Sequence, residues 1–149
     1  MTRLLERVHW FPATRQLVFV PRNGIELPGR LRGLPVSREW TVEEFGLFLA
    51  GLYGRRWVAP LATVDSGDLG AEDTPERALL DYLDGGLPPL WRSGRTGVRN
   101  VLLGGTVTGP GGAVVCVVDT DGSVHFQTIE RFVEAVQGIL LVVGDQTGE

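Results

Sequence analysis

Apolar residues recur at helical spacing in three places along the chain, each with its own start and stop signals. The capping box Thr41-Val42-Glu43-Glu44 opens the first, and Gly54 ends it. Thr74-Pro75 opens the second, with proline at the first helical position. Thr128 caps the third. The apolar faces of these three predicted helices are Phe45, Phe48, Leu49 and Leu52; then Ala78, Leu79, Tyr82 and Leu83; then Ile129, Phe132, Val133 and Val136.

Runs of apolar and β-branched residues predict strands between and after these helices, over residues 57–64, 98–108, 113–118 and 123–127. Two turn sequences connect the last three strands, Gly109-Pro110-Gly111-Gly112 and Asp119-Thr120-Asp121-Gly122. Residues 139–143 form either a final strand or a last apolar helical turn. Residues 87–99 carry no regular pattern.

The first third of the chain is also predicted to be β-rich. Its apolar runs suggest strands at Arg7–Phe11 and Gln16–Val20. Asn23-Gly24 is a strong hairpin signal, which would place a return strand at Ile25–Leu27. A short helix over Thr2–Val8 is the alternative, because the apolar residues at 4, 5 and 8 share one helical face.

Together these patterns predict a single α+β domain over residues 1–149, with a mainly antiparallel sheet and two or three helices packed on it. The strands cluster towards both ends instead of alternating with helices, which disfavours a Rossmann arrangement. Residues 145–149 are expected to fray. The predicted core includes Leu49, Leu52, Leu79, Tyr82, Val115, Val117, Phe132 and Val136.

Composition narrows the possible functions. The 149 residues are 43% hydrophobic and 21% charged, and the formal net charge of −4 disfavours nucleic acid as a partner. All basic residues are arginine, so neither a Schiff-base lysine nor a P-loop lysine exists. The lone Cys116 is expected to be a buried strand residue. Residues 1–6 lack the apolar run of a signal peptide and no stretch would span a membrane, which suggests a cytoplasmic protein.

Charge is distributed unevenly along the chain, and this points to one segment. Residues 40–87 carry three arginines against nine acids, whereas residues 88–112 carry three arginines and no acid. Those arginines are Arg92, Arg95 and Arg99, and they accompany Trp91. Tryptophan and arginine dominate the energetics of protein interfaces. We therefore predict that Trp91, Arg92, Arg95 and Arg99 contact a partner protein with an acidic surface, although a solvated loop would have the same composition.

The sequence offers little that resembles a catalytic or metal centre. His9 and His125 are the only histidines, no Gly-x-Ser-x-Gly elbow exists, and no paired Cys/His spacing suggests zinc. The glycine-rich residues 104–112 match no cofactor-binding motif. We therefore predict no catalytic residue, no metal and no cofactor. A small hydrolase that uses His9 or His125 with a carboxylate stays open.

One partial family resemblance bears on function. Residues 113–124 and the segment Thr128-Ile129-Glu130-Arg131-Phe132-Val133 follow a pattern of apolar strand, Asp-Gly turn, strand and Phe-bearing helix. Over about residues 100–137 this resembles the SMI1/KNR4 (SUKH) domains, an α+β family with many toxin-neutralising immunity proteins. The β-rich start departs from that family, which has a helix before its first turn. The resemblance implies a protein-binding role and assigns no catalytic residue.

The leading hypothesis is therefore a non-catalytic protein-binding module, such as a bacterial immunity or regulatory protein that sequesters a partner. A structural subunit of a phage or secretion apparatus is the alternative, and self-association into a homo-oligomer stays open with it. The hydrolase is the third hypothesis. A pocket that brought either histidine together with a carboxylate would favour it.

Overall fold

The chain forms seven β-strands and five α-helices in the part that the computed structural model describes, residues 2–19, 31–36, 39–55 and 58–144. The elements in order are α1 (Thr2–Arg7), β1 (His9–Trp10), α2 (Pro12–Phe19), β2 (Leu31–Val36), α3 (Val42–Leu52), β3 (Val58–Asp65), the 3-10 turn η1 (Ser66–Asp68), α4 (Glu76–Leu83), β4 (Val98–Gly109), β5 (Gly112–Val118), β6 (Val124–Thr128), α5 (Ile129–Ala135) and β7 (Val136–Gly144).

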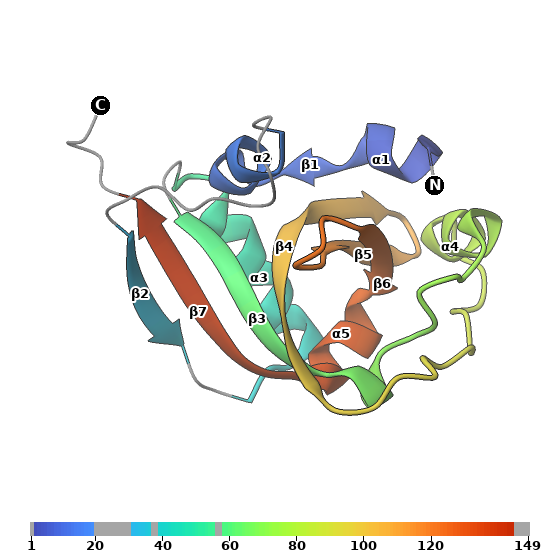
Figure 1. Cartoon of the computed structure of the whole chain (residues 1–149). Helices are drawn as coiled ribbons and strands as arrows, with labels where there is room; N and C mark the ends of the chain where they lie inside the picture. Colours follow the sequence, from blue (N-terminus) through green and yellow to red (C-terminus); the bar gives the residue numbers. More distant parts are fainter. Residues whose placement is uncertain (1, 20–30, 37–38, 56–57, 145–149) are drawn as a thin grey trace.

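All strand pairs are antiparallel, and six strands lie in the order β2-β7-β3-β4-β5-β6. The sheet twists strongly along this order, so β2 and β7 lie at one side of the molecule and the β5–β6 hairpin curls towards the other (Figure 1). The last strand, β7, lies between β2 and β3. This confirms the predicted α+β class and the mainly antiparallel sheet.

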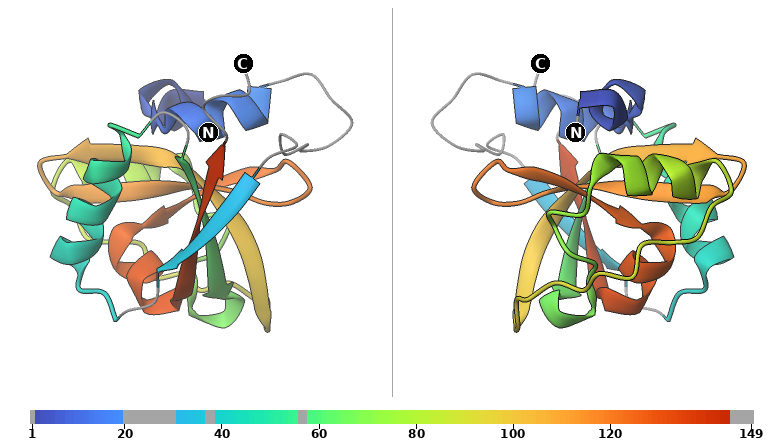
Figure 2. Two further views of the ribbon diagram at one scale, coloured as in Figure 1. Left: turned by 90° about the vertical axis from the view of Figure 1, so that its left-hand side faces the viewer. Right: turned by 90° about the vertical axis from the view of Figure 1, so that its right-hand side faces the viewer.

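Helices cover both faces of the sheet. The helices α3 and α5 pack on one face, and α1 and α4 pack on the other over β4–β6, as the two side views show (Figure 2). The strand β5 lies between these two layers, and its side chains alternate between them. Val115 and Val117 join the α3/α5 core, whereas Val114 and Cys116 join the α1/α4 core. Burial on both faces explains why this strand is an unbroken apolar run.

The strand β4 bends at two glycines, where the N-terminal segment approaches it most closely. The register between β4 and β5 shifts between Leu103 and Gly105, as at a β-bulge. A Cβ on Gly104 would come within 2.8 Å of the Trp10 ring, and one on Gly105 would collide with the carbonyl of His9. Only glycine therefore lets β1 pair with β4 at this bend.

Most of the predicted elements are confirmed. The Thr41 capping box is formed: the Thr41 hydroxyl accepts from the Glu44 amide, and the Glu44 carboxylate accepts from the Thr41 amide. Thr128 caps α5, and residues 139–143 belong to a strand. The second helix begins one residue later than expected, with Pro75 at the N-cap. The predicted core residues are buried, except Val136, which is only partly buried.

In the first third of the chain, the structure differs from the strands that the sequence predicts. Gln16 to Phe19 lie in the helix α2 and not in a strand, and Thr2–Arg7 is the helix that had been the alternative. The two extra helices raise the total from the expected two or three to five. Tertiary packing outweighs the β-prone sequence here: Phe11 is fully buried, and the buried Thr14 hydroxyl donates to the Leu103 carbonyl across 2.9 Å. The predicted Asn23-Gly24 hairpin lies outside the described residues.

Candidate functional site

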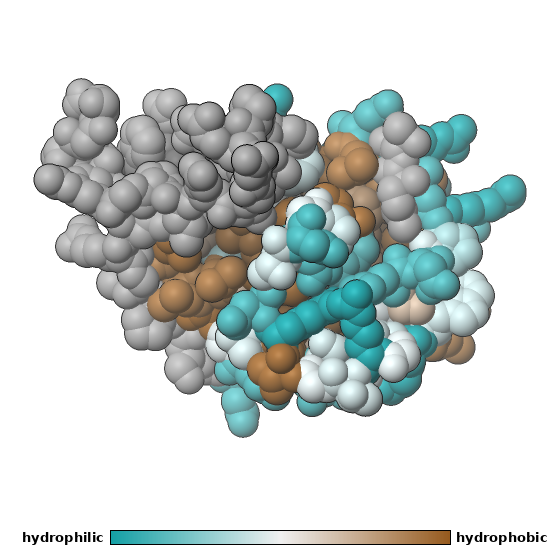
Figure 3. Space-filling view, viewed as in Figure 1, coloured by the Kyte–Doolittle hydropathy of each residue, from teal (hydrophilic) through white to brown (hydrophobic). Residues whose placement is uncertain are grey.

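The segment of residues 87–98, which follows α4 and leads into β4, presents unusual apolar surface. Eight large hydrophobic residues are exposed in the described chain, and Leu87, Leu90, Trp91 and Val98 of this segment are four of them. Leu87 is 90% exposed and Trp91 57% exposed. Hydrophobic and hydrophilic surface alternates at the lower right of Figure 3, where this segment runs. Large apolar residues that stay exposed along one segment make that segment a candidate interaction site.

The backbone of the 87–98 segment is held against the turn that follows β3. Gly70 and Arg92 form an isolated antiparallel bridge. The Ala71 amide donates to the Trp91 carbonyl across 3.0 Å, and the Ser93 amide donates to the Leu69 carbonyl across 3.0 Å. These hydrogen bonds hold the backbone in place while Trp91 projects outward. A segment held in one conformation loses less entropy when it binds a partner.

Gln127 in turn fixes that neighbouring turn to the sheet. Its side chain is 2% exposed. The amide oxygen accepts from the Gly70 amide across 2.8 Å, and the amide nitrogen donates to the Gly70 carbonyl across 3.0 Å. A buried side-chain amide is stable only when it is hydrogen-bonded. Gln127 meets that need at Gly70, and thereby connects the 87–98 segment to β6.

Four charged or titratable side chains meet beneath the 87–98 segment. Glu72 lies at their centre: its carboxylate accepts from the Arg99 guanidinium across 2.6 Å and lies 3.8 Å from His125 Nδ1. Asp119 lies 3.6 Å from Arg99 and 3.5 Å from His125 Nδ1. Arg95 reaches the same Glu72 oxygen from the surface, at 3.5 Å. The cluster of Glu72, Arg99, Asp119 and His125, here called the ionic cluster, thus ties the 87–98 segment to β4 and to the β5–β6 turn.

Burial shifts the pKa values of two members of the ionic cluster. The His125 side chain is 5% exposed, and desolvation lowers the pKa of its imidazole, assisted by the nearby Arg99 cation and opposed by Glu72 and Asp119. Desolvation raises the pKa of the Asp119 carboxyl, opposed by Arg99 and His125. The fold therefore favours a neutral imidazole at this site.

The ionic cluster also contains a set of metal-ligand types. One ligand atom each from Glu72, Asp119 and His125 lies within 4.8 Å of the others. Arg99, however, donates to the same Glu72 oxygen that faces His125 and lies beside Asp119. The guanidinium thus supplies the positive charge that the two carboxylates require, and a divalent cation would have to compete with it. The geometry favours an ion-pair network over a metal centre.

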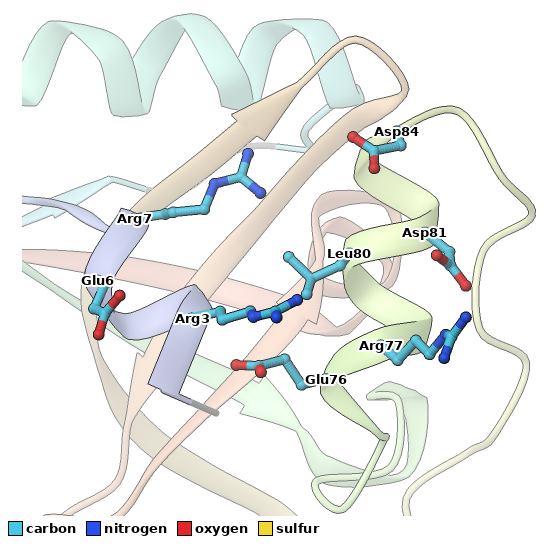
Figure 4. A pocket seen from close by; sticks show the side chains of 8 residues that line it. All are labelled: Arg3, Glu6, Arg7, Glu76, Arg77, Leu80, Asp81 and Asp84. Carbon is cyan, nitrogen blue, oxygen red and sulfur yellow. The ribbon is translucent and has the colours of Figure 1, made fainter.

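The two histidines occupy different kinds of environment, and none of the three cavities found in the described chain brings either of them together with a carboxylate. His125 has two carboxylates nearby, but it lines none of the three cavities described here. His9 lines a groove of about 480 Å³, but no carboxylate lines it. The largest of the three, about 690 Å³, lies between α1 and α4 and contains no histidine (Figure 4). It is lined by Arg3, Glu6, Arg7, Glu76, Arg77, Leu80, Asp81 and Asp84.

The four residues predicted to contact a partner divide into two groups. Trp91, Arg92 and Arg95 are exposed on the 87–98 segment. Arg99 lies in β4, and its side chain is only 17% exposed because it pairs with Glu72. Its guanidinium pairs with Glu72 and Asp119 instead of facing solvent.

The ionic cluster has no signature in the sequence. Its members come from positions 72, 99, 119 and 125, and no local motif connects them. Asp119 was predicted to form a turn, which it does through hydrogen bonds with Ser123 and Gly122. Leu87 and Leu90 were also missed as surface residues, although Pro88-Pro89 between them was a sign of irregular structure.

Comparison with known proteins places this chain in a family. Residues 27–149 match the family of unknown function DUF6885. The chain belongs to that family. No curated protein and no solved structure matches it. The match includes the 87–98 segment and the whole ionic cluster, and it leaves out α1, β1 and α2. In the described part of this DUF6885 member, no helix is long and apolar enough to cross a membrane.

The lowered pKa of His125 predicts how the stability of the folded protein depends on pH. Because the folded-state pKa of His125 lies below the ordinary histidine value of about 6.5, the unfolded chain binds a proton on His125 at a higher pH than the folded chain does. Acidification from about pH 7.5 to about pH 5.5 should therefore destabilise the wild-type protein through this group. The raised pKa of Asp119 acts in the opposite sense, at pH values above 3.8.

Comparison with His125→Gln isolates the histidine. The difference in melting temperature between wild type and His125→Gln should shrink as the pH falls, because only the wild type loses the contribution of the neutral imidazole. His9→Gln, at an exposed position, is the matched control and should follow the wild type. A constant wild-type-to-His125→Gln difference over this range would contradict the lowered pKa.

Proposed function

We propose that this protein is a non-catalytic protein-binding module and that the 87–98 segment is its principal contact surface. The observation that carries the proposal is the concentration of exposed Leu87, Leu90, Trp91 and Val98 on one backbone segment that the fold holds in place. A domain gains nothing in stability from large apolar side chains that face solvent. They become stabilising when a partner covers them.

The charges of the segment support an acidic partner. Arg92 and Arg95 are exposed on either side of Ser93, and residues 88–112 contain no acid. The chain as a whole carries a net charge of −4, so an acidic partner would be repelled by most of the surface and attracted here. Guanidinium groups form charge-assisted hydrogen bonds with carboxylates, which adds orientation to the apolar contact.

The sequence resemblance to SMI1/KNR4 (SUKH) domains suggests the specific form of this proposal, a cytoplasmic bacterial immunity or regulatory protein that sequesters a toxin or enzyme. The structural-subunit alternative makes a second copy of this chain the partner. Sedimentation velocity over a range of concentrations separates them. A monomer at all concentrations favours a different protein as the partner, and concentration-dependent association that Trp91→Ala abolishes favours the subunit.

Replacing Trp91 and Arg95 together with alanine should weaken partner binding by about 2 kcal/mol or more, since both are of the residue types that dominate interface energies. Thermal stability should change little. Trp91 is 57% exposed, and the Arg95–Glu72 pair involves a guanidinium side chain that is 56% exposed, so its loss costs well under ~1 kcal/mol. A photo-crosslinking residue at position 90 identifies the partner from the native host, and calorimetry with the purified partner then measures binding.

The matched control removes the same residue classes elsewhere. Leu47 on α3 is 75% exposed and Arg77 on α4 is exposed, so Leu47→Ala/Arg77→Ala deletes comparable apolar and cationic surface. This control should bind the partner like the wild type. Equal binding by wild type and Trp91→Ala/Arg95→Ala would exclude the segment as the contact surface.

A further inference from the structure

The groove beside His9 has the features of a small-molecule site separate from the 87–98 segment. It has a volume of about 480 Å³, within the range of roughly 300–1,000 Å³ that ligand pockets occupy. Elements from both ends of the chain form it: the end of α1, β1, α3, the β4–β5 hairpin and the start of α5. Its lining residues are Arg7, His9, Gly46, Leu49, Ala50, Tyr53, Thr106, Val107, Thr108, Ala113 and Ile129.

One wall of the groove is rigid before any ligand arrives. The His9 and Tyr53 rings stack with centroids 3.8 Å apart and planes within 6°. The Tyr53 hydroxyl donates to the His9 carbonyl, lies 2.9 Å from the Thr106 hydroxyl, and accepts from the Thr106 amide across 3.1 Å. These bonds lock Tyr53, and with it the position of β1 against α3. A preorganised wall lowers the entropy lost on binding.

The floor of the groove exists because Gly46 has no side chain. Gly46 lies in the middle of the eleven-residue helix α3, a position where glycine is less favourable than alanine. Packing does not require it: a Cβ there would meet only the Ile129 Cδ1 atom, at an ordinary 3.9 Å. The glycine instead leaves open space next to Leu49 and Ile129, which are 1% and 7% exposed.

The Arg7 guanidinium lies at one end of the apolar floor of the groove. The Arg7 guanidinium donates to the Thr108 carbonyl across a long 3.5 Å, and it forms no ion pair with a carboxylate among the described residues. Figure 4 shows its side chain extending from the end of α1 towards the β4–β5 hairpin, away from Glu6 and Glu76. No carboxylate lines this groove, and although Arg7 also borders the acid-rich cavity between α1 and α4, it forms no ion pair with the described carboxylates there.

We propose that this groove binds a small amphipathic carboxylate, with its apolar body over Gly46, Leu49 and Ile129 and its carboxylate paired with Arg7. An apolar pocket with a few polar groups that fix orientation is the usual form of a small-molecule site. The single cation selects the charge of the ligand. An arginine–carboxylate pair can form two parallel hydrogen bonds, which fixes the orientation of the ligand head.

The full-length protein tests this with 2-naphthoate as the probe and 2-naphthamide as its uncharged analogue, in amide-resolved NMR titrations. In the wild type, saturable shift changes should centre on the groove residues Ala50, Tyr53 and Thr106. Arg7→Gln should weaken 2-naphthoate binding at least fivefold and leave 2-naphthamide binding unchanged. Arg3→Gln, on the same helix but outside this groove, is the matched control and should behave like the wild type.

Variants with larger side chains that fill the groove provide a second test of the proposal. Gly46→Leu should reduce binding of both probes at least tenfold, because its side chain occupies the floor. Ala50→Phe, at an exposed lining position, does the same if Gly46→Leu fails to fold. The variant Trp91→Ala/Arg95→Ala should bind 2-naphthoate like the wild type. The groove and the proposed interface are therefore tested independently of each other. No saturable shift in the wild type, or undiminished binding in a folded groove-filling variant, would overturn the proposal.

Discussion

Replacing Phe132 with alanine should lower the free energy of unfolding by about 3–5 kcal/mol, the largest effect we expect from a single side chain. Phe132 is fully buried on α5, and its ring centroid lies 5.6 Å from that of Phe45 on α3. The substitution deletes the contact between the two helices that cover one face of the sheet. Most of the loss comes from apolar area returned to water, and the rest from the cavity that the surroundings cannot close.

Urea unfolding followed by tryptophan fluorescence measures this loss. Val133→Ala, at the next position on the same helix, is the control, because Val133 is only partly buried and should cost much less. A loss below ~1 kcal/mol for Phe132→Ala would show that the α3–α5 layer is not the main core. An unchanged denaturant slope would confirm that the variant unfolds from the same compact state.

Replacing Glu72 with alanine should destabilise the protein by about 2–3 kcal/mol and loosen the 87–98 segment. Removal of one partner from a fully buried ion pair costs ~3–5 kcal/mol, because the other charge stays buried without compensation. The Glu72 side chain is 29% exposed, so water reduces the cost. Arg99, with a side chain 17% exposed, would keep only Asp119, at 3.6 Å, among the described carboxylates. Arg95 would lose its contact as well.

Chemical denaturation gives the stability change, and hydrogen exchange reports the segment. The amides of Ala71 and Ser93, which bond across the two segments, should exchange faster in Glu72→Ala. Asp73→Ala, at an exposed neighbouring acid, should leave both measurements unchanged. Adding Arg99→Met to Glu72→Ala should recover part of the stability, because no unpaired cation then stays buried. Equal effects of Glu72→Ala and Asp73→Ala would exclude the ionic cluster as the anchor.

Local signals predicted the helices and strands wherever the relevant residues were near one another in sequence. Thr41 and Glu44 form a capping box across three residues, and the turn from Asp119 to Gly122 needs only four residues and a glycine at φ 87°. The strand predicted over Gln16–Phe19 was wrong, because the helix found there depends on burying Phe11 and Thr14 against strands that are distant in the sequence.

The candidate site was predictable only in part, for the same reason. Trp91, Arg92 and Arg95 are neighbours in sequence, and their composition alone indicated a contact surface. The pairing of Glu72 with Arg99, and the approach of His125 and Asp119, depend on the order of strands in the sheet. No spacing rule gives that order. A charged residue that looks solvated in sequence, such as Arg99, becomes a structural cation when the sheet brings carboxylates to it.

The position of β7 between β2 and β3 sets an order on folding. Residues 31–36 and 58–65 are made early, but they gain their shared neighbour only when residues 136–144 are available. On the ribosome, the β4–β5–β6 hairpins can close while β2 still lacks its only strand partner in the described sheet. Closure of such distant pairings is slow and leaves strand edges open for that time. The nascent chain therefore keeps strand edges open to misassociation until β7 inserts.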